Sequence, residues 1–276
     1  MCRITASISP ARTTSEDILC GSPRSLLVQA GAVKGRFQDD GWGIGFFREG
    51  GREAIIKSPL PARLNAGPFC RAAAKARSRV TLAHVRYASA PGVPMAKQVR
   101  MENTQPFSGG GFIFAHNGTL FIKDEIRSLL GKYASRIKGN GDSEVLFWQA
   151  MKMLDAYGSP AAALEAALDE IRTVWVSRRD SVPGRKFPYT GLNLFLASKD
   201  SLTVLCHAPR SDARASLMTP GWEYGRIAWH RKKNRVVFSS EPTDASPGWK
   251  KMNDPEIASA SVSGGKLRLS LKRVQL

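Results

Sequence analysis

Several features that define other classes of protein are scarce in this sequence. No apolar run approaches the ~20 residues of a membrane-spanning helix, so we expect no membrane partner. No long apolar segment follows the first residues, so no secretory signal is predicted. The four cysteines lie far apart and form no CxxC pair: Cys2, Cys20, Cys70 and Cys206. We therefore expect neither a disulfide scaffold nor a zinc ribbon, and predict a reduced, cytoplasmic protein.

Acidic residues are also scarce. The chain has 23 Asp and Glu against 41 Lys and Arg, which gives a net charge of +18. Such an excess can mark nucleic-acid binding, because Lys and Arg contact phosphates regardless of sequence. Here the basic residues are scattered, and the densest stretch, residues 231–235, is short and precedes an apolar segment. We interpret most of the excess as solvated surface and predict no nucleic-acid partner.

The order of the predicted elements indicates the fold class. The 276 residues contain no repeat, low-complexity tract or linker, so we expect a single domain over residues 1–276. Helical patterns follow Asp142 and Pro160 in the middle of the chain, with shorter ones at 71–77 and 123–130. Strand-like segments occur on both sides, at 4–8, 43–47, 54–57, 80–85, 111–115, 191–197, 202–206, 235–239 and 266–271. This order favours a layered α+β fold with both strand sets in one core.

The first candidate for chemistry is Cys2. Removal of Met1 would make Cys2 the N-terminal residue, with a thiol and a free amine on one residue. An α-amine has an ordinary pKa of about 7.7–8.0 and can therefore act as a general base near neutral pH. Taken alone, a cysteine at position two is more often an ordinary residue near a chain end.

Four further segments place glycine, polar and charged residues where strands end or helices begin. They are DGWG at 40–43, HVRYAS at 84–89, ENTQPF at 102–107 followed by HNG at 116–118, and GDSE at 141–144. Each has an ordinary structural explanation: glycines serve turns, Asn-Gly is a common turn pair, and Asp142 is a good helix N-cap. None of them indicates a function by itself.

Together and in this order, these segments resemble the class II glutamine amidotransferase domain, a branch of the N-terminal nucleophile hydrolases. The similar residues run from Cys2 to about Glu144, and weaker similarity continues through 192–198 and 239–242. The resemblance implies a four-layer αββα sandwich, in which two antiparallel sheets pack face to face and helices cover their outer sides.

The resemblance also implies a role for each site residue. Cys2 would be the nucleophile, and the Asn117 side chain and Gly118 backbone N–H would stabilise the oxyanion. Arg86 would hold the α-carboxylate of the substrate, because its planar guanidinium binds both oxygens. Asp142 would hold the α-ammonium group.

Other residues receive weaker assignments. Tyr87 and Ser89 follow Arg86 where the family lines the same pocket, and we expect them to bind substrate. We interpret Trp42–Gly43 as a pocket wall and backbone position. His84 and His116 are predicted to be structural, because a family cysteine uses its own amine as base. No residues have metal-ligand spacing, so neither a metal nor a cofactor is predicted.

The expected function is hydrolysis of the γ-amide of glutamine, or of another γ-glutamyl compound, through a Cys2 thioester, with release of glutamate and ammonia or an amine. Arg3 departs from the small residue common after the nucleophile, and we expect no second domain that uses ammonia. The chain thus resembles the stand-alone branch, which includes hydrolases of γ-glutamyl bonds in small thiol compounds; an ammonia-accepting partner protein is left open. The alternatives are an acylase acting on a non-glutamyl amide, against which Arg86 and Asp142 argue, and an inactive basic binding or scaffold protein on the same fold.

Overall fold

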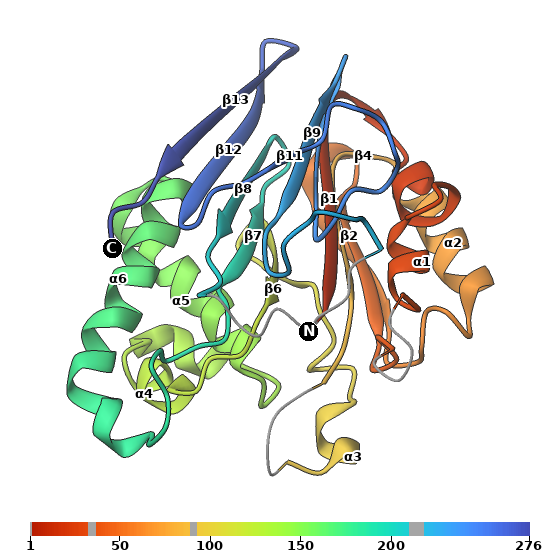
Figure 1. The fold of residues 1–276 in the computed structure, drawn as a ribbon. Coiled ribbons are helices and arrows are strands. Elements are labelled where there is room, and N and C mark those ends of the chain that lie inside the picture. Colours follow the sequence, from red (N-terminus) through yellow and green to blue (C-terminus); the bar gives the residue numbers. More distant parts are fainter. Residues whose placement is uncertain (1, 33–36, 89–92, 210–217) are drawn as a thin grey trace.

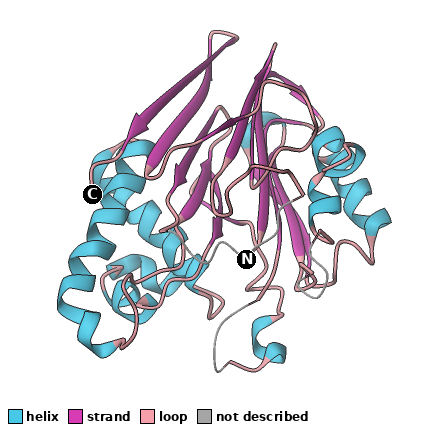
Figure 2. Cartoon of the chain, viewed as in Figure 1, coloured by secondary structure: helices cyan, strands magenta, loops and turns pink. Residues whose placement is uncertain are grey.

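Two antiparallel sheets form the centre of the molecule, with helices on their outer faces (Figure 1). The structure, a computed structural model, describes residues 2–32, 37–88, 93–209 and 218–276. The helices gather on two opposite sides of the strands (Figure 2), so the layers run helix, sheet, sheet, helix. The predicted four-layer αββα arrangement is confirmed.

The first sheet joins strands from both ends of the chain. Its central strand β1 pairs with β10 on one side and with β4 on the other, so that Thr5 lies opposite both Ser239 and Ala83. The prediction that the two strand sets share one core is therefore correct. The seven strands lie in the order β11 (Lys250–Lys251), β9 (Ala228–Lys232), β10 (Arg235–Ser239), β1 (Arg3–Thr13), β4 (Ser78–Val85), β2 (Trp42–Phe47) and β3 (Glu53–Ser58).

The second sheet carries the middle of the chain. Strand β6 ends at Asn117, directly opposite Asn193 of β7, so both asparagines lie at one end of this sheet. The six strands lie in the order β13 (Lys266–Arg273), β12 (Glu256–Ser263), β8 (Ser201–Cys206), β7 (Asn193–Ala197), β6 (Phe112–Asn117) and β5 (Phe107–Gly109).

Helices cover each sheet with apolar side chains. The first sheet is covered by α1 (Leu26–Gln29), α2 (Ala66–Lys75) and a π-helical turn at Asp17–Gly21. The second is covered by α4 (Lys123–Ser128), α5 (Asp142–Tyr157) and α6 (Pro160–Arg178). Helix α6 begins as its sequence predicts, with Pro160 in the first turn and the Ser159 hydroxyl accepting the Ala162 N–H at 3.2 Å. The remaining helical segments are α3 (Met95–Gln98) and the 3₁₀ turns Glu49–Gly51, Gly131–Arg136 and Arg179–Ser181.

A third apolar cluster lies between the sheets. Ile4 and Ile8 of β1 and Phe238 of β10 pack there against Phe195 and Val204 of the second sheet, all with almost no exposed surface. This shared core fixes β1, and with it Cys2, against the sheet that carries Asn117.

The predicted segments all occur, with bounds shifted by several residues, but some elements escaped sequence reasoning. The clearest is β12, whose sequence EIASASVS alternates small residues that carry little hydrophobic signal. It becomes a strand because its backbone pairs with both β8 and β13. Strand β9 includes Arg231 and Lys232, which sequence reasoning had placed before a strand.

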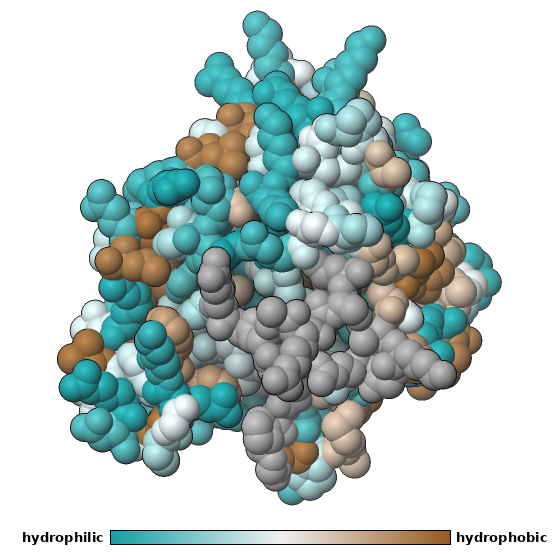
Figure 3. Space-filling view, viewed as in Figure 1, coloured by the Kyte–Doolittle hydropathy of each residue, from teal (hydrophilic) through white to brown (hydrophobic). Residues whose placement is uncertain are grey.

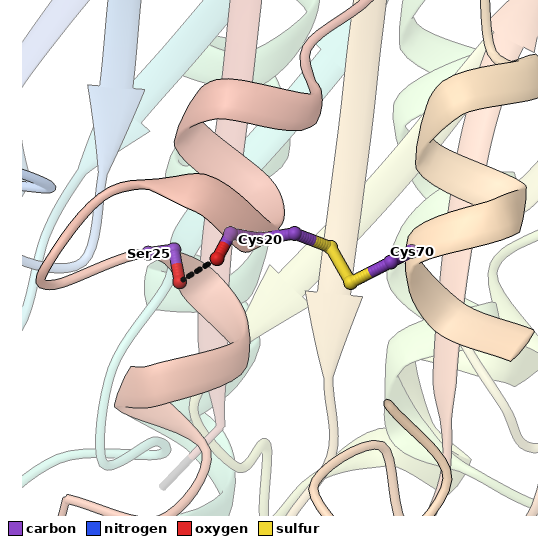
Figure 4. The surroundings of a disulfide bond; sticks show 3 residues. All are labelled: Cys20, Ser25 and Cys70. Atoms are coloured by element: carbon purple, nitrogen blue, oxygen red, sulfur yellow. Dashed lines mark hydrogen bonds between the residues drawn. A yellow bond between two sulfur atoms is a disulfide. The ribbon is translucent and has the colours of Figure 1, made fainter. Parts of the chain in front are cut away.

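The prediction that the cysteines are all reduced is wrong. Cys20 and Cys70 form a disulfide, with their Cα atoms 5.9 Å apart (Figure 4). The bond joins the π-helical turn to α2, and the Ser25 hydroxyl donates to the Cys20 carbonyl oxygen beside it at 3.2 Å. The two cysteines are 50 residues apart in sequence, and only the packing of both helical segments on the first sheet brings them together.

This disulfide gives a stability prediction. Closing a 50-residue loop stabilises the folded state by about 4 kcal/mol in the chain-entropy model. We expect Cys20→Ser to lower the melting temperature by roughly 5–10 °C, while the folded variant keeps its activity, because neither cysteine lines the cavity described below. Cys70→Ser and the double variant should lower it equally. A reductant that lowers the melting temperature of Cys20→Ser as much as that of the wild type would contradict this pairing.

The basic residues lie mainly at the surface. Hydrophilic side chains project from the end of the molecule where the β12–β13 hairpin turns (Figure 3). In the dense stretch at 231–235, Lys233 is exposed, whereas Lys232 and Arg235 form ion pairs with Asp244 and Asp17. Within the described part of the chain, no helix is both long and apolar enough to cross a membrane.

Candidate active site

Cys2 lies immediately before β1, at one end of the first sheet, and is 8% exposed. Its Sγ accepts the Tyr87 N–H at 3.3 Å and lies 3.5 Å from the Tyr87 carbonyl oxygen. Burial raises the pKa of the Cys2 thiol, and the Tyr87 N–H and the Arg86 charge offset this only in part. The thiol therefore needs a base before it can act as a nucleophile at neutral pH.

A cavity of about 260 Å³ opens beside this thiol. It brings together most of the site residues predicted from the sequence, although they lie far apart along the chain. Asn117 is not among the residues that line the cavity; its Nδ2 donates to the Cys2 carbonyl oxygen at 2.9 Å. Ser89 lies outside the described residues. The predicted residues in the cavity wall are Cys2, Arg86, Tyr87, Gly118 and Asp142.

Arg86 is positioned by the turn that follows β4. Its N–H donates to the Gly41 carbonyl oxygen at 2.8 Å, and its Nη1 donates to the Gln98 carbonyl oxygen at 2.7 Å. The Asp40 carboxylate accepts the Ala88 N–H at 2.6 Å. Gly41 has a φ of +115°, and a Cβ there would press on the backbone of Ser58, so the DGWG run needs glycine at this point. That run thus fixes the backbone on both sides of Arg86.

The last residue of β6 and the residue after it are the two predicted oxyanion donors. Asn117 is 5% exposed, and its Oδ1 has no hydrogen-bond partner among the described residues. Gly118 has a φ of +151°, and a Cβ there would collide with the Gly191 carbonyl oxygen. Only glycine fits this position, and Gly118 lines the cavity.

Asp142 begins α5, where a carboxylate is favoured by the helix dipole. Its Oδ2 accepts the Leu120 N–H at 2.7 Å, which ties the start of the helix to the loop after Gly118. The Ser143 hydroxyl lies 3.4 Å from the other oxygen. Asp142 thus places a negative charge in the cavity wall that also holds Cys2 and Arg86.

His84 and His116 are buried, and neither ring hydrogen-bonds to the thiol. Burial lowers the pKa of His84 to about 3, with smaller effects from the charges of Arg86 and His116, so this ring is neutral. The pKa of His116 is also lowered, mainly by burial. The prediction that Trp42 forms part of the pocket wall is wrong. Its ring packs edge-on against Phe69 in the core under α2, with 5.2 Å between the ring centroids. The reason is that β2 turns this side chain toward the helices.

Sequence reasoning gave no role to Gln105 and Ser143, although both lie in its motifs. Gln105 accepts the His116 N–H at 2.6 Å and donates from its Nε2 to the His116 carbonyl oxygen and the Ser143 hydroxyl. That hydroxyl lies 3.0 Å from His116 Nδ1. The ENTQPF, HNG and GDSE segments therefore form one buried network, and their joint occurrence was the only signal for it.

The described residues include no group of three His, Cys, Asp or Glu side chains that could hold a metal. What the cavity offers is a thiol, a cation, a carboxylate and backbone N–H groups. This set fits the transfer of an acyl group to a thiol from the side chain of an amino acid whose α-carboxylate and α-ammonium groups are both free.

Comparison with known sequences agrees with this geometry. The family profile described as class-II glutamine amidotransferases matches residues 17–259. The γ-glutamyl-hercynylcysteine sulfoxide hydrolase of Mycolicibacterium smegmatis is 28% identical over 261 residues, covering 93% of this chain and 94% of that protein. The enzyme of the same name from Mycobacterium tuberculosis is 26% identical, with 92% and 91% covered. Both names describe hydrolysis at a γ-glutamyl amide, the class of reaction predicted from the sequence.

Two solved structures share the fold. A glutamine aminotransferase class-II domain protein from Silicibacter pomeroyi superimposes with a TM-score of 0.64 at 18% identity, and all of both chains is covered. The glutamine phosphoribosylpyrophosphate amidotransferase of Bacillus subtilis gives a TM-score of 0.63 at 14% identity; all of this chain matches 50% of that one.

Proposed function

Since the chain belongs to the class II glutamine amidotransferases, we propose that it hydrolyses a γ-glutamyl amide through a thioester on Cys2. One observation supports this most: Cys2, Arg86 and Asp142 line the same small cavity although they come from three separate segments. A cation and a carboxylate in one cavity can bind the α-carboxylate and α-ammonium groups of an amino acid. The side-chain amide of that amino acid can then reach the thiol.

The proposed reaction needs only groups of this chain and water. After Met1 is removed, the Cys2 amine takes the thiol proton, and Sγ attacks the γ-carbonyl carbon of the substrate. The Asn117 Nδ2 and the Gly118 N–H donate to the resulting oxyanion. The carbon–nitrogen bond then breaks, and the Cys2 ammonium returns its proton to the leaving amine. Water hydrolyses the thioester, which releases glutamate and regenerates the thiol.

Recognition of the head group follows from charge. The Arg86 guanidinium can bind both oxygens of the α-carboxylate, while its Nη1 stays bonded to the Gln98 carbonyl oxygen. Asp142 offers its carboxylate to the α-ammonium. Tyr87 contributes its backbone N–H to the thiol, and we propose that its side chain bounds the same space.

The cavity volume bears on the identity of the substrate. At about 260 Å³ it lies just below the 300–1,000 Å³ typical of pockets for drug-sized ligands. It therefore suits a glutamyl group, and a larger leaving group must extend through the opening. With two relatives named as hydrolases of a γ-glutamyl cysteine sulfoxide conjugate, we propose a γ-glutamyl conjugate of a substituted cysteine as the preferred substrate.

A substrate panel tests this proposal. Glutamate release would be measured from glutamine, glutathione, a γ-glutamyl cysteine sulfoxide conjugate and their α-glutamyl isomers. We expect release from the γ-linked compounds alone, with the highest kcat/KM for the conjugate. Glutamine as the best substrate would instead favour an ammonia-accepting partner protein. Release from none of them, or equally from the α-linked isomers, would contradict the proposed function.

Binding and chemistry can be separated by two substitutions. Arg86→Lys should raise KM about tenfold with little change in kcat, because an ammonium cannot hold both carboxylate oxygens in a fixed fork. Asn117→Ala should instead lower kcat about 100-fold, since the oxyanion exists only along the reaction path. The exposed Arg268→Lys is the control and should change neither constant. Equal effects of Arg86→Lys and Asn117→Ala on KM alone would contradict these roles.

A further inference from the structure

A series of buried polar side chains, linked by hydrogen bonds, lies outside the cavity and takes no part in the proposed chemistry. The Tyr189 hydroxyl lies 2.7 Å from His207 Nε2, and His207 Nδ1 lies 2.6 Å from an oxygen of Asp254. The other Asp254 oxygen accepts the Ala208 N–H at 3.0 Å and a bond from Arg226. Tyr189 and His207 are each 4% exposed, so both side chains are almost fully buried.

The direction of these hydrogen bonds follows from the ionisation of Asp254, the last residue of the series. Burial acts to raise the pKa of Asp254, but the hydrogen bonds from His207, the Ala208 N–H and Arg226 outweigh it, so this carboxylate is ionised and can only accept. His207 therefore donates from Nδ1, and in its neutral form Nε2 accepts the Tyr189 hydroxyl proton. Burial raises the pKa of Tyr189, so its hydroxyl stays protonated and able to donate. The three side chains form one ordered series, from Tyr189 through His207 to Asp254.

Tyr189 belongs to a segment that lies along the loop after β6. The Phe121 N–H donates to the Pro188 carbonyl oxygen at 2.8 Å. The Thr190 N–H donates to the Thr119 carbonyl oxygen at 3.0 Å, and the Thr119 N–H returns a bond to the Thr190 hydroxyl. Residues 188–190 thus hold residues 119–121 by three hydrogen bonds.

The same segment also packs against Gly118, one of the two predicted oxyanion donors. The Gly191 carbonyl oxygen occupies the space where Gly118 would carry a Cβ, and it lies 3.1 Å from His116 Nε2. The next residue, Leu192, donates its N–H to the His207 carbonyl oxygen at 2.6 Å. The segment that sets the orientation of the Gly118 peptide is therefore attached to His207 at both its ends, by the side chain of Tyr189 and the backbone of Leu192.

We propose that Tyr189, His207 and Asp254 are positioning residues that hold the Gly118 N–H in place for the oxyanion; this inference rests on the proposed function. Asp254 orients the His207 ring, and the ring holds the Tyr189 hydroxyl. Residues 188–191 are thereby fixed, and their contacts fix the loop at 118–121. A donor to the oxyanion acts on the transition state, so its misplacement lowers kcat and leaves substrate binding unchanged.

The test begins with Tyr189→Phe, which removes one oxygen and retains the ring. We expect kcat for glutamate release to fall about tenfold with KM changed less than twofold, and the rate of Cys2 alkylation by iodoacetamide to stay the same. Tyr133→Phe is the matched control: its hydroxyl also bonds a carboxylate, that of Asp155, but lies outside the cavity wall, and kcat should not change. A role limited to stability would lower the melting temperature of Tyr189→Phe and leave its kcat at the wild-type value, which would overturn the proposal.

A double-mutant cycle tests the connection. His207→Asn can retain a donor toward Asp254 but loses the acceptor for Tyr189, so it should lower kcat as Tyr189→Phe does. The double variant should be no slower than either single variant, because both break the same link. Additive losses of kcat would overturn the proposal.

Amide hydrogen exchange supplies a readout that does not need activity. Residues 118–121 should exchange faster in Tyr189→Phe than in the wild type, and unchanged exchange there would also overturn the proposal. If the wild-type protein releases no glutamate from any γ-glutamyl compound, the proposed function fails, and the positioning role is judged on exchange alone.

Discussion

Cys2→Ala is expected to abolish glutamate release, with a loss on the order of 10⁴-fold or more, because no other described thiol lies in the cavity. The variant should fold normally and still bind substrate, since Arg86 and Asp142 are unchanged. Steady-state glutamate release, together with substrate binding by calorimetry, measures both expectations.

Cys206 supplies the matched control for this prediction. It is the second free cysteine of the described chain and is fully buried, and burial raises its pKa to about 12, so it stays a neutral thiol. Cys206→Ala should keep its turnover. A chloroketone analogue of glutamine should add once, to the N-terminal peptide, in the wild type and in Cys206→Ala but not in Cys2→Ala. Wild-type turnover by Cys2→Ala would require a different mechanism altogether.

A chain that retains Met1, or that carries an uncleavable N-terminal tag, is expected to fold but to lose about 10²–10⁴-fold in activity. Its Cys2 nitrogen is an amide and cannot take the thiol proton, while burial keeps the pKa of that thiol high. Neither His84 nor His116 hydrogen-bonds to Sγ, so neither ring takes the place of the amine. Glutamate release by tagged and untagged protein measures the effect.

Two controls use the same tag, one with the tag at the C-terminus and one with the tag removed from the N-terminus. Placed after Leu276 it should leave activity intact, and its exact removal from the N-terminus, back to Cys2, should restore activity. Intact mass should show the active form lighter by one methionine. Full activity from a chain verified to retain Met1 would assign the base to another group.

The sequence was informative where function requires particular residue types at fixed places. The roles of Cys2, Arg86, Gly118 and Asp142 were predicted from the family resemblance, and the structure brings these residues to one cavity because each adjoins the start or the end of a regular element, at the same end of the two sheets. The pairing of β1 with β10 was predicted in outline from strand-like segments at both ends of the chain.

The features that the sequence did not indicate arise where segments distant in sequence come together in the fold. Cys20 and Cys70 gave no spacing signal, because their contact arises from two helical segments packed on one sheet. The series from Tyr189 to His207 to Asp254 spans three separate segments without a recognisable motif. Trp42 was misplaced because a strand has two faces, and its neighbours in sequence do not say which face lies toward the substrate.

The central place of β1 has a consequence for the lifetime of the enzyme. Chain ends are usually frayed and are the points at which exopeptidases begin to digest a protein. Here the functional end continues directly into a strand that is paired on both sides, and the Ile4 N–H and carbonyl oxygen are both bonded to Ser240. An aminopeptidase would have to draw Cys2 and Arg3 out of the sheet against these bonds before it could cleave. We therefore expect the fold to protect Cys2, the proposed nucleophile, from trimming.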